Sequence, residues 1–183
     1  MSFTFPRVEA KKPGYSPEQV DAFLARARAQ FNSPLDGGVS AHDVRNTEFD
    51  LVRGGYSPEV IDSAMDKLED SFAARELQRQ KTEKGSYALD DRLARVVELV
   101  RGRVERPKGK KFSSTGFLLR GYSRKQVDSL CEHVARHLDS KAPISIEQVR
   151  RVVFNVKRGG YAEAHVDAFI DRVIETLQIE QNR

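Results

Sequence analysis

Cysteine and histidine gather at one place in this chain of 183 residues, at Cys131, His133 and His137. Thiolate and imidazole are ligands that zinc prefers, so this cluster is the first candidate for a chemical site. A structural zinc site uses four ligands, however, and Cys131 stands where three related helices of the chain carry a large apolar residue. The sequence therefore predicts a buried cysteine, two surface histidines and no metal.

Four aspartates recur at one position of four similar helices: Asp21, Asp62, Asp128 and Asp167. Repeated carboxylates could serve acid–base catalysis. An acidic residue near a helix start also favours the helix dipole or pairs with a nearby arginine. No phosphate loop or nucleophile elbow accompanies them. We therefore expect a structural role, and predict neither enzymatic activity nor a cofactor.

A basic segment is the third candidate. Residues 80–111 hold 10 Lys and Arg against 5 Asp and Glu, while the whole chain has a net charge of +4. The cations concentrate in 101–111: Arg101, Arg103, Arg106, Lys108, Lys110 and Lys111. Such a cluster could bind lipid headgroups or nucleic-acid phosphates, or it could simply be a solvated helix end whose cations favour the helix C-terminus. No aromatic residue interleaves it before Phe112, which disfavours base stacking and hence nucleic acid.

One short sequence motif occurs four times, and we call it the phrase: a Gly-Tyr step, followed five residues after the Tyr by an apolar residue and then Asp. The structure around the phrase must set the positions of the candidate side chains named above. The turn residues of the phrase are the pairs Gly14-Tyr15, Gly55-Tyr56, Gly121-Tyr122 and Gly160-Tyr161. Glycine tolerates a positive φ, and we expect it at Gly55 and Gly160, where a helix would end directly before the next helix cap. Gln19 and Gln126 stand where they would complete capping boxes with the preceding serines.

After each phrase, apolar residues recur at helical spacing along one face for about three turns. Before the second and fourth phrases, the segments 39–49 and 144–154 begin with capping signals and predict a further helix, so that each forms a helical hairpin with the helix after the turn. A stripe from Leu89 to Val104 predicts a helix in the basic spacer, with polar linkers at 76–86 and 108–111.

The order of these units predicts an all-α protein made of two duplicated helical modules. The first module spans 1–79 (units 5–35 and 39–79), the helical spacer spans 80–111, and the second module spans 112–183 (units 112–142 and 144–179).

Phe49 and Phe154 each lie five residues after a valine of the predicted core, Val44 or Val149, and therefore about 140° round the predicted helix from it. They either seal against the neighbouring unit or form a surface for a partner, and the internal seal is favoured.

Composition narrows the class of protein. Apolar residues make up 39% and charged residues 32%, and no stretch approaches the ~20 apolar residues that a membrane span needs. A single cysteine excludes an intramolecular disulfide, and the first residues lack the apolar core of a secretory signal. We therefore expect a cytoplasmic protein.

The second and fourth units resemble the N-terminal domain of the DivIVA family. The matching residues are Val44-Arg-Asn46-Thr-Glu-Phe49, Arg53-Gly-Gly-Tyr56 and Ile61-Asp62, and again Phe154, Arg158-Gly-Gly-Tyr161 and Val166-Asp167-Ala-Phe169. The resemblance implies a bacterial, non-enzymatic scaffold of cell division or polar growth, located at septum or pole, that binds curved membrane and recruits partners. Family members with membrane activity place a Phe-Arg pair before the Gly-Tyr step, and here only Leu119-Arg120 combines an apolar and a basic residue there.

Together these features predict a protein–protein interaction module whose partner belongs to the division or envelope machinery. Its expected contact surface includes the exposed helix faces near Tyr56 and Tyr161. The alternative is electrostatic binding to anionic membrane or nucleic acid through 101–111. A protein partner is favoured over lipid, because three of the four turns lack an apolar tip.

Overall fold

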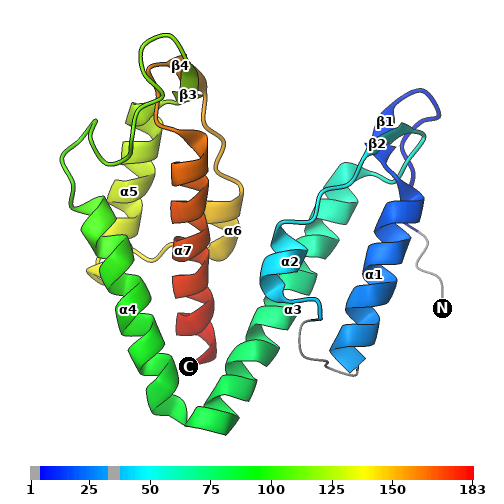
Figure 1. Cartoon of the computed structure of the whole chain (residues 1–183), viewed down its shortest axis with the longest axis horizontal. Helices are drawn as coiled ribbons and strands as arrows, with labels where there is room; N and C mark the ends of the chain where they lie inside the picture. Colours follow the sequence, from blue (N-terminus) through cyan, green and yellow to red (C-terminus); the bar gives the residue numbers. More distant parts are fainter. Residues whose placement is uncertain (1–4, 33–37) are drawn as a thin grey trace. The chain divides into compact units, whose positions relative to one another are not determined.

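The computed structural model describes residues 5–32 and 38–183 (Figure 1). These residues are mainly helical, as expected, but they also form four three-residue strands that no sequence pattern predicted. The helices are α1 (Pro17–Asn32), α2 (Ala41–Arg45), α3 (Pro58–Lys84), α4 (Ser86–Val104), α5 (Arg124–Leu138), α6 (Ile146–Arg150) and α7 (Glu163–Asn182). The strands are β1 (Pro13–Tyr15), β2 (Leu51–Arg53), β3 (Arg120–Tyr122) and β4 (Val156–Arg158).

The chain forms two compact units, residues 1–76 and 77–183. The expected spacer is therefore not separate from both modules: α4 belongs to the second unit, where Val96, Val100 and Val104 join the main core cluster. The linker expected at 76–86 is also absent as such, since α3 continues to Lys84 and α4 begins at Ser86. Glu, Gln, Arg and Lys are good helix formers, and Gly85, with φ of 80°, makes the break.

The segments before the second and fourth phrases are only partly helical. Ser40 and Ser145 cap α2 and α6 with complete capping boxes, as the sequence indicated, but each helix has five residues. The chain then runs extended into β2 or β4 instead of continuing to residue 49 or 154. β-Branched residues such as Val152 and Val153 lose side-chain entropy in a helix, which favours this early end. The predicted helical hairpins are therefore a short helix, a strand, a turn and a long helix.

The short strands join the two Gly-Tyr steps of each unit. β1 pairs antiparallel with β2, with Gly14 opposite Val52, and β3 pairs with β4, with Gly121 opposite Lys157. Beyond the strands, Tyr15 and Tyr56 exchange both backbone hydrogen bonds, at 2.9 and 2.8 Å. Tyr122 and Tyr161 do the same at 3.0 and 2.9 Å. In each unit the two turns thus hold one another.

The positive φ angles occur one residue earlier than expected. Gly54 and Gly159 have φ of 68° and 63°, whereas Gly55 and Gly160 do not enter the left-handed region. The prediction was wrong because a strand, not a helix, precedes each turn, so the first glycine of the pair makes the reversal.

Gly55 and Gly160 are needed for a different reason, which is the close approach of two backbones. A Cβ on Gly14 would lie 2.5 Å from the Tyr56 carbonyl oxygen, and one on Gly55 would lie 2.5 Å from the Gly14 carbonyl oxygen. Gly121 and Gly160 face the same steric conflict across their turn. Any side chain at these positions would separate the two paired turns.

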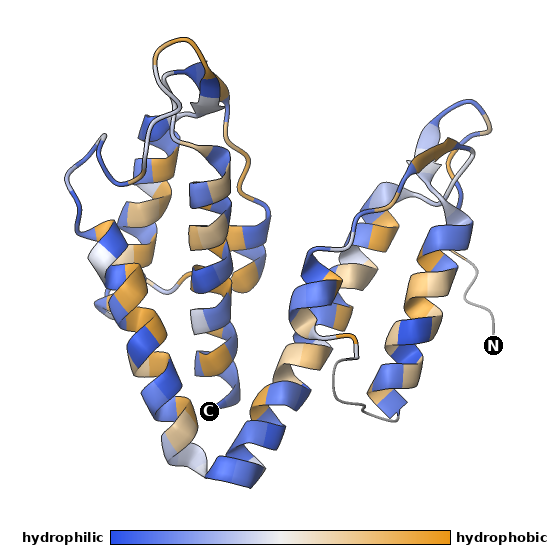
Figure 2. Cartoon of the chain, viewed as in Figure 1, coloured by the Kyte–Doolittle hydropathy of each residue, from blue (hydrophilic) through white to orange (hydrophobic). Residues whose placement is uncertain are grey.

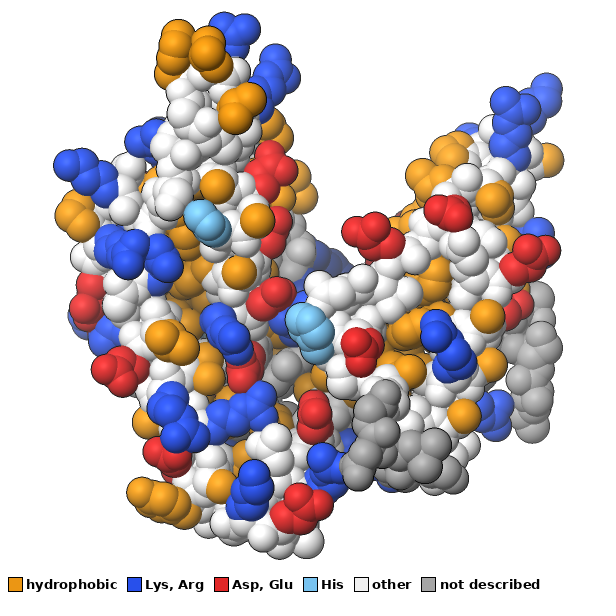
Figure 3. All heavy atoms as spheres, in the orientation of Figure 1, with side chains coloured by type: hydrophobic (Ala, Val, Ile, Leu, Met, Phe, Trp, Pro, Cys, Tyr) orange, Lys and Arg blue, Asp and Glu red, His pale blue; other side chains and the backbone are white. Residues whose placement is uncertain are grey.

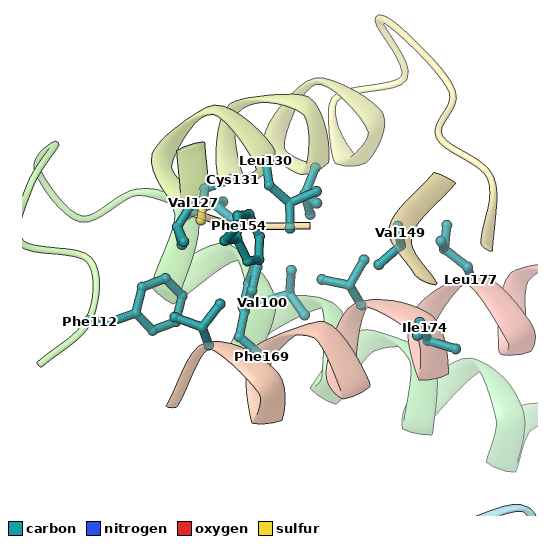
Figure 4. Close-up of a cluster of buried hydrophobic side chains, with 14 of the residues drawn as sticks. Val100, Phe112, Val127, Leu130, Cys131, Val149, Phe154, Phe169, Ile174 and Leu177 are labelled. Atoms are coloured by element: carbon teal, nitrogen blue, oxygen red, sulfur yellow. The ribbon is translucent and has the colours of Figure 1, made fainter. Parts of the chain in front are cut away.

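The long helices next to these turns carry apolar residues along their length (Figure 2), and these residues form the core of each unit. In the second unit one cluster combines residues of α4, α5, α6 and α7, including Val100, Cys131, Val149 and Phe169 (Figure 4). In the first unit the core has two smaller parts. One combines Phe23, Ala27, Val44 and Phe72, and the other combines Val20, Tyr56 and Ile61.

Replacing Gly160 by Ala is expected to destabilise the second unit by about 3 kcal/mol or more, the upper range for overpacking, because its Cβ would meet the Gly121 carbonyl. Gly159→Ala should cost less, about 1–2 kcal/mol, since only its positive φ is unfavourable. Gly102→Ala is the control: this helical glycine has open space around it, so alanine should stabilise by about 0.5–1 kcal/mol. Urea unfolding would measure the free energy of unfolding of all three variants. Equal losses for Gly160→Ala and Gly159→Ala would contradict the importance of the close approach between the two backbones.

Candidate interaction site

Each of the four aspartates lies near the turn tyrosine of the opposite repeat, and two of them accept its hydroxyl. Tyr56 donates its hydroxyl to Asp21 at 3.2 Å, and Tyr161 donates to Asp128 at 2.9 Å. Burial raises the pKa of Tyr15 and of Tyr122, and the nearby carboxylates of Asp62 and Asp167 raise it further. The neighbour that the structure shows for these aspartates is therefore a tyrosine and not an arginine. Each tyrosine ties its own turn to the first turns of the other repeat's long helix.

Tyr161 is the most enclosed of these tyrosines, with no exposed surface. Its hydroxyl also accepts the backbone N–H of Lys111 at 3.1 Å, and Asp128 accepts the N–H of Gly109 at 2.7 Å. Burial raises the pKa of Tyr161 to about 12. At neutral pH the hydroxyl stays protonated, and its contacts fasten the loop before β3 to α5.

Gln19 and Gln126 link the repeats of their units instead of completing local capping boxes. The side-chain oxygen of Gln19 accepts the backbone N–H of Asp50 at 2.8 Å, and that of Gln126 accepts the N–H of Asn155 at 2.8 Å. The backbones of Ser16 and Ser123 reciprocate by donating to the carbonyls of Asp50 and Asn155 at 2.8 Å. The expected capping boxes were wrong because a backbone segment distant in sequence competes for the same amide.

The cysteine and the two histidines do not form a joint site. Cys131 lies buried in the core, and burial raises the pKa of its thiol to about 12. His137 accepts the Ile144 N–H through Nδ1 at 3.2 Å and contacts Glu180 through Nε2 at 2.9 Å, while His133 is exposed. Within the described part of the chain, no group of three or more His, Cys, Asp or Glu residues could hold a metal ion.

Two cations of the basic segment bind backbone carbonyls at and just after the end of α4. Lys111 is 4% exposed, and its ammonium donates to the carbonyls of Val104 and Arg106 at the C-terminus of α4. Arg103 donates to the Lys111 carbonyl at 3.0 Å and stacks over Phe112. These cations complement the negative end of the helix dipole.

Two further cations pair with acids of the same unit. Arg101 contacts Asp139 at 3.0 Å, and Lys108 contacts Glu132 at 2.6 Å. The remaining members, Arg106 and Lys110, are exposed. The segment 101–111 therefore presents fewer cations for an external phosphate than its sequence suggests.

Phe49 and Phe154 point inward. Phe154 is 8% exposed and its ring lies 5.1 Å from that of Tyr122, while Phe49 lies 5.6 Å from Tyr15 and 6.0 Å from Phe23. Both therefore seal their unit against its neighbouring repeat, and neither is placed as a surface for a partner.

The most exposed run of apolar residues lies in the loop before β3, which we call the apolar tip (Phe117–Leu119). Phe117, Leu118 and Leu119 are 79%, 76% and 65% exposed. The base of this loop is held firmly: Thr115 donates its N–H to Gly160, and Arg124 donates to Gly159 and Ser114. Figure 3 shows hydrophobic side chains gathered with Lys and Arg at the end of the second unit that carries β3 and β4.

Three cations of the β3–β4 ladder lie beside this tip. Arg120 lies directly opposite Arg158 in the β3–β4 ladder, and Lys157 is adjacent, with all three exposed. Like charges opposite one another in an antiparallel pair repel. An anionic ligand at this end of the unit would relieve that repulsion.

The corresponding loop of the first unit is polar. It contains Glu9 and Lys12, whose side chains form an ion pair at 2.9 Å, and Pro13 stands opposite Arg53 where the second unit has two arginines. The sequence patterns singled out Leu119 and Arg120 but not Phe117, Leu118 or Lys157. The run of three apolar residues after Gly116 was the available signal, since no helix or strand pattern contains it.

None of the described helices is both long enough and apolar enough to cross a membrane. No family model, curated protein or solved structure matches the chain. Its function must therefore be inferred from its own residues and their contacts.

Tyr161→Phe is expected to destabilise the second unit by about 1–3 kcal/mol, because it removes a buried hydroxyl that bonds Asp128 and the Lys111 amide. Tyr56→Phe should cost less than about 1 kcal/mol, since its hydrogen bonds to the exposed Asp21 are longer and water can replace them. Chemical denaturation of the two variants would measure the difference. A larger cost for Tyr56→Phe would contradict the assignment.

Proposed function

We propose that this chain is a non-enzymatic adaptor that attaches peripherally to an anionic membrane surface and recruits a protein partner. The side chains that could support catalysis, namely Cys131, the four aspartates and the turn tyrosines, are engaged in holding the fold. A role in bacterial cell division or polar growth is supported by the DivIVA-like phrases of the sequence alone.

A duplicated architecture forms part of this proposal. The two units have the same strand register and the same pair of backbone hydrogen bonds between their turn tyrosines. At equivalent positions, Gln19 and Gln126 each accept a backbone N–H of the other repeat. Such agreement supports descent from a single two-repeat module. The loops at the ends of the units then had freedom to diverge, because the pairing of the turns uses mainly backbone atoms.

The observation that carries the proposal is the apolar tip with the three cations of the adjacent β3–β4 ladder. Three adjacent exposed apolar side chains, with Arg120, Lys157 and Arg158 beside them, match an interfacial lipid anchor. Each large apolar side chain that leaves water contributes about 1.5–3 kcal/mol, and each cation near an anionic surface about 1 kcal/mol. The freedom lost on binding offsets part of this gain, so the tip supports reversible attachment.

The alternative surface, residues 101–111, has less support, because most of its cations already have partners within the second unit. A protein partner for the tip itself is the other candidate. The repulsion between Arg120 and Arg158 favours an anionic surface over a neutral one.

Vesicle flotation tests the attachment. We expect the purified chain to float with vesicles of phosphatidylglycerol and phosphatidylcholine, but not with phosphatidylcholine alone. The triple variant Phe117→Ser, Leu118→Ser and Leu119→Ser should lose flotation, because it removes the apolar contribution. Leu51→Ser is the matched control, since it changes an apolar residue that is 61% exposed in the first unit.

Two outcomes would overturn this assignment. Absence of flotation at low salt would exclude membrane attachment by the chain itself. Flotation that survives the triple variant but is lost on Arg106→Gln with Lys110→Gln would instead favour the basic segment 101–111.

A further inference from the structure

A second surface of the second unit is shaped for a partner. A groove of about 260 Å³ lies between α5, α6 and the loop that joins them, and we call it the α5–α6 groove. Leu130, Ile144 and Val152 provide apolar lining, and His133, Arg136 and Gln148 contribute polar lining. Small-molecule pockets usually span about 300–1,000 Å³, so this groove is better matched to one or two side chains of a peptide.

The charge around the groove is positive on its α5 side. Glu132 is engaged by Lys108 at 2.6 Å, and Asp139 is engaged by Arg101 at 3.0 Å and Lys141 at 3.1 Å. Arg136 and His133 are exposed beside the apolar lining. On α6, the exposed Glu147 is offset by the exposed Arg151 just beyond its end. A carboxylate is therefore the complementary group for a ligand that lies against α5.

The first unit provides an internal comparison. Val153, which follows the groove residue Val152 in the chain, is 85% exposed, and it stands seven residues before Gly160. Seven residues before Gly55 the first unit has Glu48, with Thr47 preceding it in place of Val152. The fold thus accepts polar residues at both positions. Their apolar character in the second unit is not a requirement of the turn, and adjoining exposed apolar residues are a feature of contact surfaces.

The equivalent part of α1 is also filled differently. Phe23 occupies the place of Leu130, counted from the Gly-Tyr step, and the guanidinium of Arg26 lies over its ring at 5.6 Å. Fifteen residues after the glycine of the step, where the second unit has Arg136, α1 has Ala29, so the cation at that position is particular to the second unit.

We infer that the α5–α6 groove binds an acidic peptide segment of a partner protein. The peptide places a large apolar side chain against Leu130, Ile144 and Val152, and sets a carboxylate on Arg136. This inference rests on the proposed adaptor function and identifies the chemistry of the recruited partner, but it does not depend on the apolar tip.

Selection from a displayed random-peptide library, with the full chain as bait, tests the inference. We expect the recovered peptides to combine Asp or Glu with Leu, Ile or Phe. Fluorescence anisotropy of these peptides should show binding weakened about tenfold or more by Arg136→Glu, because an attractive charge pair becomes repulsive. Val153→Glu, which installs the residue type of the first unit, should weaken it similarly.

Two controls separate binding in the groove from binding elsewhere on the chain and from loss of the fold. Glu48→Lys changes the equivalent exposed position of the first unit and should leave peptide affinity unchanged, and circular dichroism should show that each variant is folded. The serine triple variant of the apolar tip should bind the peptides normally. Failure of flotation with intact peptide binding would then reject the membrane proposal alone.

The inference is overturned if no peptide is recovered, or if the recovered peptides are basic. It is equally overturned if Arg136→Glu and Val153→Glu both leave the affinity unchanged, because the peptides would then bind elsewhere.

Discussion

The backbone pairing of two Gly-Tyr steps is the interaction on which each unit depends. The backbone N–H of Tyr122 donates to the carbonyl of Tyr161, and the N–H of Tyr161 donates to the carbonyl of Tyr122. Tyr15 and Tyr56 form the same two hydrogen bonds in the first unit. This approach is possible only because glycine precedes each tyrosine. A buried backbone group without a partner costs about as much as a lost hydrogen bond, so neither turn is complete without the other. Each unit therefore needs both of its Gly-Tyr turns.

The pairing also explains where the tyrosine side chains go. With the two backbones crossed, each hydroxyl reaches the aspartate on the long helix of the opposite repeat, as Tyr161 reaches Asp128. Next to the paired turns, the side chains of Gln19 and Gln126 accept the backbone N–H groups of Asp50 and Asn155, which adds a second link between the repeats. Because these links use a few residues at the base of the turns, the loops beyond them can change. The first unit has a polar loop there and the second has the apolar tip, while the links at the base are the same.

The long helices could be predicted from the sequence, and the contacts between repeats could not. A 3.6-residue stripe identifies α5 or α7 locally, because the information lies within the helix itself. The strands have three residues each, too few for an alternating pattern, and β3 pairs with a segment more than thirty residues away. Gln126 and Asp128 were assigned local roles for the same reason, since their true partners are distant in sequence.

Candidate site residues were predicted less well than the fold. A cluster of cations looks alike in the sequence whether it faces solvent or caps a helix, and only the structure shows that Lys111 is buried against the end of α4. Phe154 was weighed correctly as an internal seal. Phe117 and Leu118 were overlooked because apolar residues in a loop carry no periodicity. Val153 was placed in a predicted helix over 144–154, whereas α6 ends at Arg150.

Amide hydrogen exchange at the turn tyrosines tests the central claim most directly. If the crossed turns complete each unit, the N–H groups of Tyr122 and Tyr161 exchange only when the second unit unfolds as a whole. Their protection should then equal that of core amides in α5 and α7, and Tyr15 and Tyr56 should match the core of the first unit. Fast exchange at these amides, comparable with that of the exposed Leu118 loop, would contradict the claim that the paired turns complete each unit.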